Sequence, residues 1–166
     1  MPGQEIDRIC TALNWQEMSP QTRRQEVAWA FLFALETAMR LGEILALTRD
    51  DLDILGRYIT VQTSKNGDKR HVPLTRRALE LFKMMEDRPK TFLQVGRDVA
   101  SVMFRRARID ADIEELRFHD TRHEALTRLA RKLDVLDLAR MVGHRDPRSL
   151  MTYYNATATE IASRLD

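Results

Sequence analysis

The 166-residue sequence has little cysteine, glycine or proline: one Cys, six Gly and five Pro. A single thiol, Cys10, provides neither a disulfide framework nor a thiolate metal cluster, which is typical of a reducing environment. No apolar run approaches the length of a membrane span, and no segment resembles a signal peptide. These absences disfavour a disulfide-rich secreted protein and a membrane protein. We expect a cytoplasmic protein with no membrane contact.

The length and charge of the chain fit a single globular domain over residues 1–166. The net charge is only +2, but it is unevenly distributed. Residues 1–56 hold nine acidic and five basic side chains, a net of −4, whereas residues 57–166 hold 22 basic and 16 acidic ones, a net of +6. A long basic segment is typical of a surface that binds a polyanion, although an ordinary solvated surface has the same composition.

Apolar periodicity predicts a mainly helical chain. The residues Ser19-Pro20 match a helix N-cap followed by proline, so we expect a long helix with one buried stripe to begin there. Gly143 marks the end of a shorter helix. The helices expected from spacing and capping cover 5–13, 21–39, 43–47, 75–88, 97–108, 119–133, 135–142, 147–154 and 160–165.

One segment has the pattern of a β-hairpin instead. Residues 58–63 are β-branched and aromatic, Asn66-Gly67 is a type I′ turn signal, and 69–74 resume an extended pattern. The fold class expected is therefore α+β, mainly α-helical, with a small antiparallel hairpin or sheet.

Four short strings carry residues suited to chemistry. They are 37–43 with Arg40, 63–67 with Lys65, 118–123 with His119 and Arg122, and 142–154 with His144, Tyr153 and Tyr154. Taken singly, each has a structural explanation, such as an Arg40–Glu43 ion pair or a helix cap from His119. We also expect His123, which adjoins the His119 and Arg122 motif, to buttress the site as a satisfied core histidine. We expect Asp120 to orient a basic group, and Arg105, Arg106 and Arg108 either to touch phosphates or to form a solvated face.

Taken together, the two arginines, the lysine, two histidines and a tyrosine suit the chemistry of a phosphodiester. The set has no carboxylates, so we expect neither a metal ion nor a cofactor. Arginine forks match phosphate oxygens and stabilise a pentavalent transition state. A lysine can protonate the leaving oxygen, and a histidine can either take up the proton of the nucleophile or hydrogen-bond the phosphate. Tyrosine attack then forms a covalent intermediate.

The order of these residues resembles that of the tyrosine recombinases of the phage-integrase family. An arginine, a lysine in a β-turn, His-x-x-Arg, Gly-His and a tyrosine nine residues later follow one another. The strings FHDTRHEA at 118–125 and GHRDPRS at 143–149 are similar to integrases of proteobacterial mobile elements and shufflon-type invertases. The resemblance covers roughly residues 23–154 and implies the catalytic set Arg40, Lys65, His119, Arg122, His144 and Tyr153.

The resemblance implies the activity and the partners as well. It implies site-specific recombination of double-stranded DNA through a 3′-phosphotyrosyl intermediate, by a homotetramer that assembles from monomers on paired sites. The segment 156–166 is the candidate for docking on a neighbour. Family members usually carry an N-terminal helical domain that these residues do not include, so the chain is either a piece of a longer protein or a short relative.

The sequence departs from the common family pattern at three positions. Ala38 stands where the family often has Gly, Gly42 replaces a small polar residue, and Tyr154 adds a second hydroxyl. Three other functions remain open: a type IB topoisomerase, a non-catalytic DNA-binding module and a helical protein-interaction domain. The GHRDPRS string argues against the first, intact Arg40, Arg122 and Tyr153 against the second, and the ordered set of six against the third.

Overall fold

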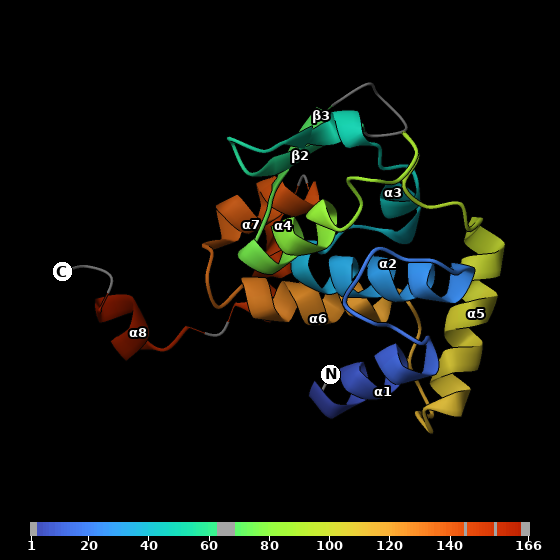
Figure 1. Cartoon of the computed structure of the whole chain (residues 1–166). Coiled ribbons are helices and arrows are strands. Elements are labelled where there is room, and N and C mark those ends of the chain that lie inside the picture. Colours follow the sequence, from blue (N-terminus) through green and yellow to red (C-terminus); the bar gives the residue numbers. More distant parts are fainter. Residues whose placement is uncertain (1–2, 63–68, 145, 155, 164–166) are drawn as a thin grey trace.

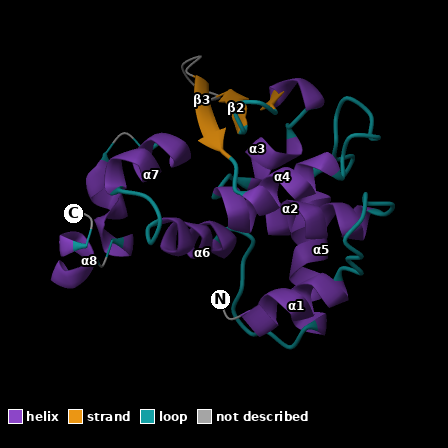
Figure 2. Ribbon diagram, turned by 60° about the vertical axis from the view of Figure 1, so that its left-hand side comes forward, coloured by secondary structure: helices purple, strands orange, loops and turns teal. Residues whose placement is uncertain are grey.

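The computed structural model describes residues 3–62, 69–144, 146–154 and 156–163. The fold is mainly helical with a small three-stranded antiparallel sheet, which confirms the expected class (Figures 1 and 2). The helices are α1 (Gly3–Ala12), α2 (Arg23–Thr37), α3 (Leu41–Leu45), α4 (Arg76–Lys83), α5 (Arg97–Asp110), α6 (Asp120–Leu129), α7 (Val135–Val142) and α8 (Ala158–Ala162), with 3₁₀ turns η1 (Arg49–Asp51) and η2 (Pro147–Tyr153).

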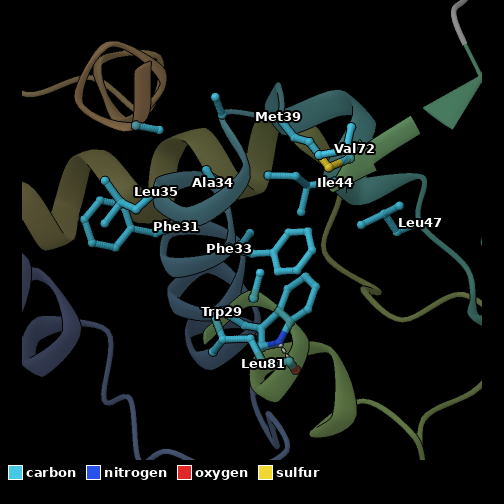
Figure 3. Packing of buried hydrophobic residues seen from close by; sticks show 14 of the residues in the cluster. Trp29, Phe31, Phe33, Ala34, Leu35, Met39, Ile44, Leu47, Val72 and Leu81 are labelled. Carbon is cyan, nitrogen blue, oxygen red and sulfur yellow. Dashed lines mark hydrogen bonds between the residues drawn. The ribbon is translucent and has the colours of Figure 1, made fainter. Parts of the chain in front are cut away.

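Helix α2 forms the centre of the core. It packs against α3, α4, α5 and α6, and its aromatic side chains Trp29, Phe31 and Phe33 have no exposed surface (Figure 3). The rings of Trp29 and Phe33 stack at 4.7 Å, and the Trp29 indole donates a hydrogen bond to the Leu81 carbonyl at 2.7 Å. The expectation of a single buried stripe is therefore wrong, because neighbours surround this helix on several sides.

The start of α2 also differs from the expectation. Thr22, rather than Ser19, is the N-cap, and its hydroxyl accepts from the backbone N–H of Gln25 at 3.2 Å. The Gln25 side chain accepts in return from the backbone N–H of Thr22, which completes a capping box. Two donors at the helix start are thereby satisfied, which Ser19-Pro20 alone would not achieve.

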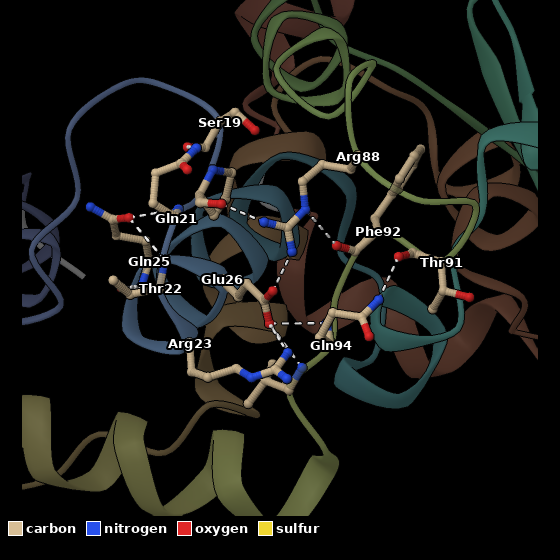
Figure 4. A network of polar contacts seen from close by, with 12 residues as sticks. Ser19, Gln21, Thr22, Arg23, Gln25, Glu26, Arg88, Thr91, Phe92 and Gln94 are labelled. Atoms are coloured by element: carbon tan, nitrogen blue, oxygen red, sulfur yellow. Dashed lines mark hydrogen bonds and ion pairs between the residues drawn. The ribbon is translucent and has the colours of Figure 1, made fainter.

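A buried carboxylate ties the loop after α4 to the start of α2. Glu26 is only 3% exposed, and it forms ion pairs with Arg23 at 3.2 Å and with Arg88 (Figure 4). The same carboxylate accepts from the backbone N–H groups of Gln94 and Val95 at 3.0 and 2.8 Å. Burial of this charge is tolerated because each oxygen has a donor. The cluster fixes the loop that leads into α5.

The sheet consists of β1 (Leu52–Asp53), β2 (Tyr58–Gln62) and β3 (Lys69–Pro73) in the order β1-β2-β3. The β2–β3 hairpin confirms the prediction, whereas β1 was not expected. Its turn, with Asn66-Gly67 and Lys65, lies outside the described residues. Burial alternates along β3, so Arg70 and Val72 face inward. That alternation places a buried arginine behind the site.

The C-terminal elements differ from the expectations in type and length. Helix α6 ends at Leu129 rather than 133, and η2 is a 3₁₀ helix. Helix α7 has the expected bounds and ends at Gly143, whose φ of 71° needs a residue that tolerates the left-handed region. Helix α8 has no buried residue. No helix in the described ranges is long and apolar enough to cross a membrane.

Candidate active site

The C-terminus of α2 turns sharply to present Arg40. Ala38 caps the helix with a φ of 54° and is fully buried. A left-handed conformation at a residue with a Cβ is uncommon, which explains why glycine suits this position in the family. Arg40 follows as the N-cap of α3, and its side chain is 51% exposed. Arg40, which the sequence predicts to bind phosphate, therefore faces solvent between the end of α2 and the start of α3.

Arg122, on α6, is buried and joins two of the segments that form the site. Its Nη1 donates to the carbonyl of Ala38, and its Nη2 donates to the carbonyl of Val142 at 3.1 Å. Burial, followed by the nearby charge of Arg40, lowers the pKa of the guanidinium to about 10, while Glu43 and Tyr153 raise it. Arginine has five N–H donors, so three remain for an oxyanion. The site thus holds Arg122 rigidly before any substrate binds.

A second buried arginine, Arg70, supports the same region from β3. It forms two hydrogen bonds with the Glu43 carboxylate, at 2.9 and 2.8 Å. Glu43 also accepts from the backbone N–H of Arg40 at 2.9 Å and pairs with its guanidinium at 3.3 Å. The pairing of Arg40 with Glu43 was expected from the sequence, whereas the participation of Arg70 was not. Its inward position in the alternating pattern of β3 was the available signal.

A cavity of about 510 Å³ opens beside Arg40, His119 and Arg122. Phe104 and Phe118 contribute apolar lining. Four further arginines also line it: Arg97, Arg105 and Arg108 of α5, and Arg117. Arg106 lines a different and smaller hollow near α1. Arg105 and Arg108 therefore lie on the side of the site, where their positive charge favours a polyanion.

His144 follows the left-handed Gly143. Its Nδ1 lies 2.7 Å from the Ser149 hydroxyl, and its backbone N–H donates to the Ala139 carbonyl at 3.0 Å. Burial lowers the pKa of His144, and the positive charges of Arg122, Arg40 and Arg70 lower it further. A neutral imidazole next to these arginines can donate or accept a hydrogen bond at a phosphate.

Tyr153, the last residue of η2, contacts His123 directly. The Tyr153 hydroxyl is hydrogen-bonded to Nδ1 of His123, and the ring of His119 lies edge-on to that of His123 at 5.4 Å. His123 is exposed, so the expectation of a buried core histidine is wrong. Because α6 places His123 immediately after Arg122 but on its open side, its ring reaches the tyrosine rather than the core. The contact between His123 and Tyr153 was not expected from the sequence.

The structure brings Arg40, His119, Arg122, His144 and Tyr153 into one region, linked by shared hydrogen bonds, ring contacts and electrostatic coupling. Lys65 lies outside the described residues. Asp120 accepts from the backbone N–H of Arg117 at 2.7 Å, so it holds the turn before α6. His119 makes no side-chain cap bond at the start of that helix.

These features form a strongly basic site with a tyrosine beside it, on a mainly helical domain. The chain belongs to the phage integrase family, whose model matches residues 1–160. It is 38% identical over 151 residues to a putative integrase/recombinase of Haemophilus influenzae, covering 88% of this chain and 49% of the relative. It is 36% identical over 168 residues to the shufflon-specific DNA recombinase of Escherichia coli, covering 96% of this chain and 43% of the relative.

The chain thus spans about half the length of these curated relatives. Among solved structures, the catalytic domain of bacteriophage HP1 integrase matches with a TM-score of 0.77 and 21% identity, over 100% of this chain and 94% of that one. The Tn1549 transposon integrase bound to circular intermediate DNA matches with a TM-score of 0.68 and 22% identity, over 100% of this chain and 64% of that one. The likeness to these solved structures shows the fold, and the family match together with the curated relatives confirms the family resemblance.

Proposed function

We propose that this chain is the catalytic domain of a tyrosine recombinase, which cuts and rejoins double-stranded DNA through a 3′-phosphotyrosyl intermediate at Tyr153. The observation that carries the proposal is the position of Tyr153. Its hydroxyl contacts a histidine, and it lies close enough to the buried Arg122 to raise the pKa of that guanidinium. Relatives named as integrase/recombinase and as a DNA recombinase support the same reaction.

The chemistry follows from the roles that the residues can take. Arg40 and Arg122 bind the non-bridging oxygens of the scissile phosphate and stabilise the added negative charge. Tyr153 attacks phosphorus, its O–P bond forms and the bond to the 5′ oxygen breaks. Lys65 protonates that oxygen, and His119 and His144 hydrogen-bond the phosphate. The bond between Tyr153 and the DNA phosphate conserves the energy of the broken phosphodiester bond, so the strand can be rejoined without another energy source.

A nicked suicide substrate tests the proposal, because loss of a short strand traps the covalent adduct. We expect a DNA-linked peptide that maps to Tyr153, and no adduct from Tyr153→Phe with DNA binding intact. Tyr154→Phe is the matched control and should still form the adduct, since Tyr154 lies beyond the end of η2, where the backbone is extended. An adduct at Tyr154 would contradict the assignment. Recombination between two sites, rather than simple relaxation of supercoils, separates the proposal from a topoisomerase.

The assembly is part of the same proposal. The free chain is a monomer, a tetramer forms on paired DNA sites, and residues 156–166 dock on a neighbouring protomer. The absence of buried residues in α8 supports this docking, because the helix has little contact with its own domain. Sedimentation of the free chain and a salt titration on duplex DNA test it. Affinity should fall with salt, by about 0.9 log units per log unit for each phosphate contact. A stable DNA-free tetramer would contradict it.

A further inference from the structure

We infer that His123 is a catalytic residue whose Nδ1 takes up the Tyr153 proton as the phenol oxygen attacks phosphorus. This role rests on the proposed function, since it assumes that Tyr153 is the nucleophile. It assigns the general base to the residue directly after Arg122, outside the six positions that the family resemblance supplied.

Geometry is the first argument. Nδ1 of His123 is hydrogen-bonded to the Tyr153 hydroxyl, and the two ring centroids are 6.1 Å apart with an interplanar angle of 35°. A general base must lie within hydrogen-bonding reach of the proton it removes. A neutral imidazole with its proton on Nε2 has a free lone pair on Nδ1 and therefore accepts from the phenol. The His123 side chain is exposed, so the substrate can approach this pair.

The other three histidines are engaged elsewhere. Nδ1 of His144 lies 2.7 Å from the Ser149 hydroxyl, and the His119 ring packs edge-on against His123 itself. His71 is on β3, where it contacts Thr60 and the ring of Tyr58. All four histidines are among the described residues, and of these His123 is the one that is hydrogen-bonded to the Tyr153 hydroxyl.

The guanidinium of Arg122 lies near Tyr153. The two are close enough for Tyr153 to contribute to the pKa of that guanidinium. The fixed positive charge of Arg122 stabilises the negative charge that develops on the phenol oxygen. Arg122 itself is held by the carbonyls of Ala38 and Val142, so it need not reorganise during attack.

The step balances without a further reactant. The bond from the Tyr153 oxygen to phosphorus forms, and the bond from phosphorus to the 5′ oxygen breaks. The phenol proton moves to Nδ1 of His123, and the 5′ oxygen receives a proton from Lys65. In rejoining, the imidazolium returns its proton to Tyr153, so His123 then acts as the acid.

The test combines His123→Gln with a fluorinated tyrosine at position 153. Glutamine keeps a hydrogen-bond acceptor but does not take up a proton, and the exposure of His123 lets the substitution leave the core intact. With ordinary tyrosine, we expect adduct formation on the nicked substrate to slow by about 10²–10³-fold. A fluorinated phenol ionises more readily and depends less on a base. With it, the defect of His123→Gln should shrink to about tenfold or less.

Matched controls separate this role from positioning. His144→Gln should be equally impaired with both tyrosines, and His71→Gln should react at the wild-type rate. A rate for His123→Gln equal to wild type, or the same defect with both tyrosines, would overturn the inference. DNA binding and thermal unfolding of each variant are measured alongside. If Tyr153→Phe still forms an adduct, the proposed nucleophile is wrong instead, so the two failures are distinguishable.

Discussion

The guanidinium of Arg70 and the carboxylate of Glu43 form a bidentate pair, with Nη1–Oε1 at 2.9 Å and Nη2–Oε2 at 2.8 Å. The side chains are 9% and 16% exposed, so water screens the pair little. Arg70 also donates from Nε to the Met141 carbonyl at 3.1 Å, and Glu43 receives the backbone N–H of Arg40. The pair therefore connects β3, α3 and the end of α7 beside Arg40.

Removal of one partner of this pair should be costly. Arg70→Met leaves the Glu43 carboxylate poorly solvated, and we expect it to lower the free energy of unfolding by about 3–5 kcal/mol. The double variant Arg70→Met/Glu43→Gln should lose less than the sum of the two single changes, because neither charge is left alone. Urea unfolding of the four proteins measures this coupling. Additive losses would show that the pair acts as two independent residues.

The contribution of Glu43 should depend on pH. Burial raises its pKa, but hydrogen bonds from Arg70 and the Arg40 backbone, together with their charges, outweigh this and lower the pKa below 4.5. For a carboxyl with a lowered folded-state pKa, the stabilisation is complete above 4.5 and is lost as the pH falls through the folded-state value. The stability difference between wild type and Glu43→Gln should therefore shrink in acid. A difference that stays constant down to about pH 3 would contradict the ion-pair origin.

The two arginines that we propose to bind phosphate, Arg40 and Arg122, should respond differently to replacement by lysine. Both Arg40→Lys and Arg122→Lys lose the bidentate fork, and adduct formation should fall by about 10²–10³-fold in each. Only Arg122→Lys should also destabilise the fold, because buried Arg122 holds the carbonyls of Ala38 and Val142 whereas Arg40 is half-exposed. Adduct rates and thermal unfolding check both parts. A near wild-type rate for Arg122→Lys would rule out the fork argument.

His144 should remain neutral to lower pH than an ordinary histidine. Burial and then the charges of Arg122, Arg40 and Arg70 lower its pKa from 6.5. The unfolded chain therefore binds a proton first as the pH falls below 6.5, and stability decreases in that window. The imidazole NMR signal of His144 should titrate with a midpoint below 6.5, and Arg40→Met should raise that midpoint. Arg97→Met, which changes another arginine of the same cavity, is the control and should leave it unchanged.

Lys65 remains a prediction from sequence, since it lies outside the described residues. If it protonates the leaving 5′ oxygen, Lys65→Ala should be impaired on ordinary DNA but rescued by a substrate with a 5′-bridging sulfur, which departs without a proton. Adduct formation on both substrates measures the rescue. Lys69→Ala, a change at an exposed residue of β3, is the control and should react normally on both. Equal impairment of Lys65→Ala on the two substrates would remove the lysine from this role.

The sequence by itself determined the local elements and most residue types of the site. Turn and capping chemistry act over a few residues, so the β2–β3 hairpin and the Gly143 end of α7 could be recognised directly. The order of Arg40, His119, Arg122, His144 and Tyr153 likewise followed from the chain. Where local signals competed, as between Ser19 and Thr22, the reciprocal bond of Gln25 decided the helix start.

Only the tertiary structure decided which of these residues touch. Arg70 is 27 residues from Glu43 and 71 from Met141, and His123 is 30 residues from Tyr153. No local pattern encodes these contacts, because they depend on how β3, α6, α7 and η2 pack around α2. Packing also buried α2 on several sides and left His123 exposed, contrary to what the sequence suggested for each. Burial is a property of the assembled core, so periodicity along one helix does not fix it.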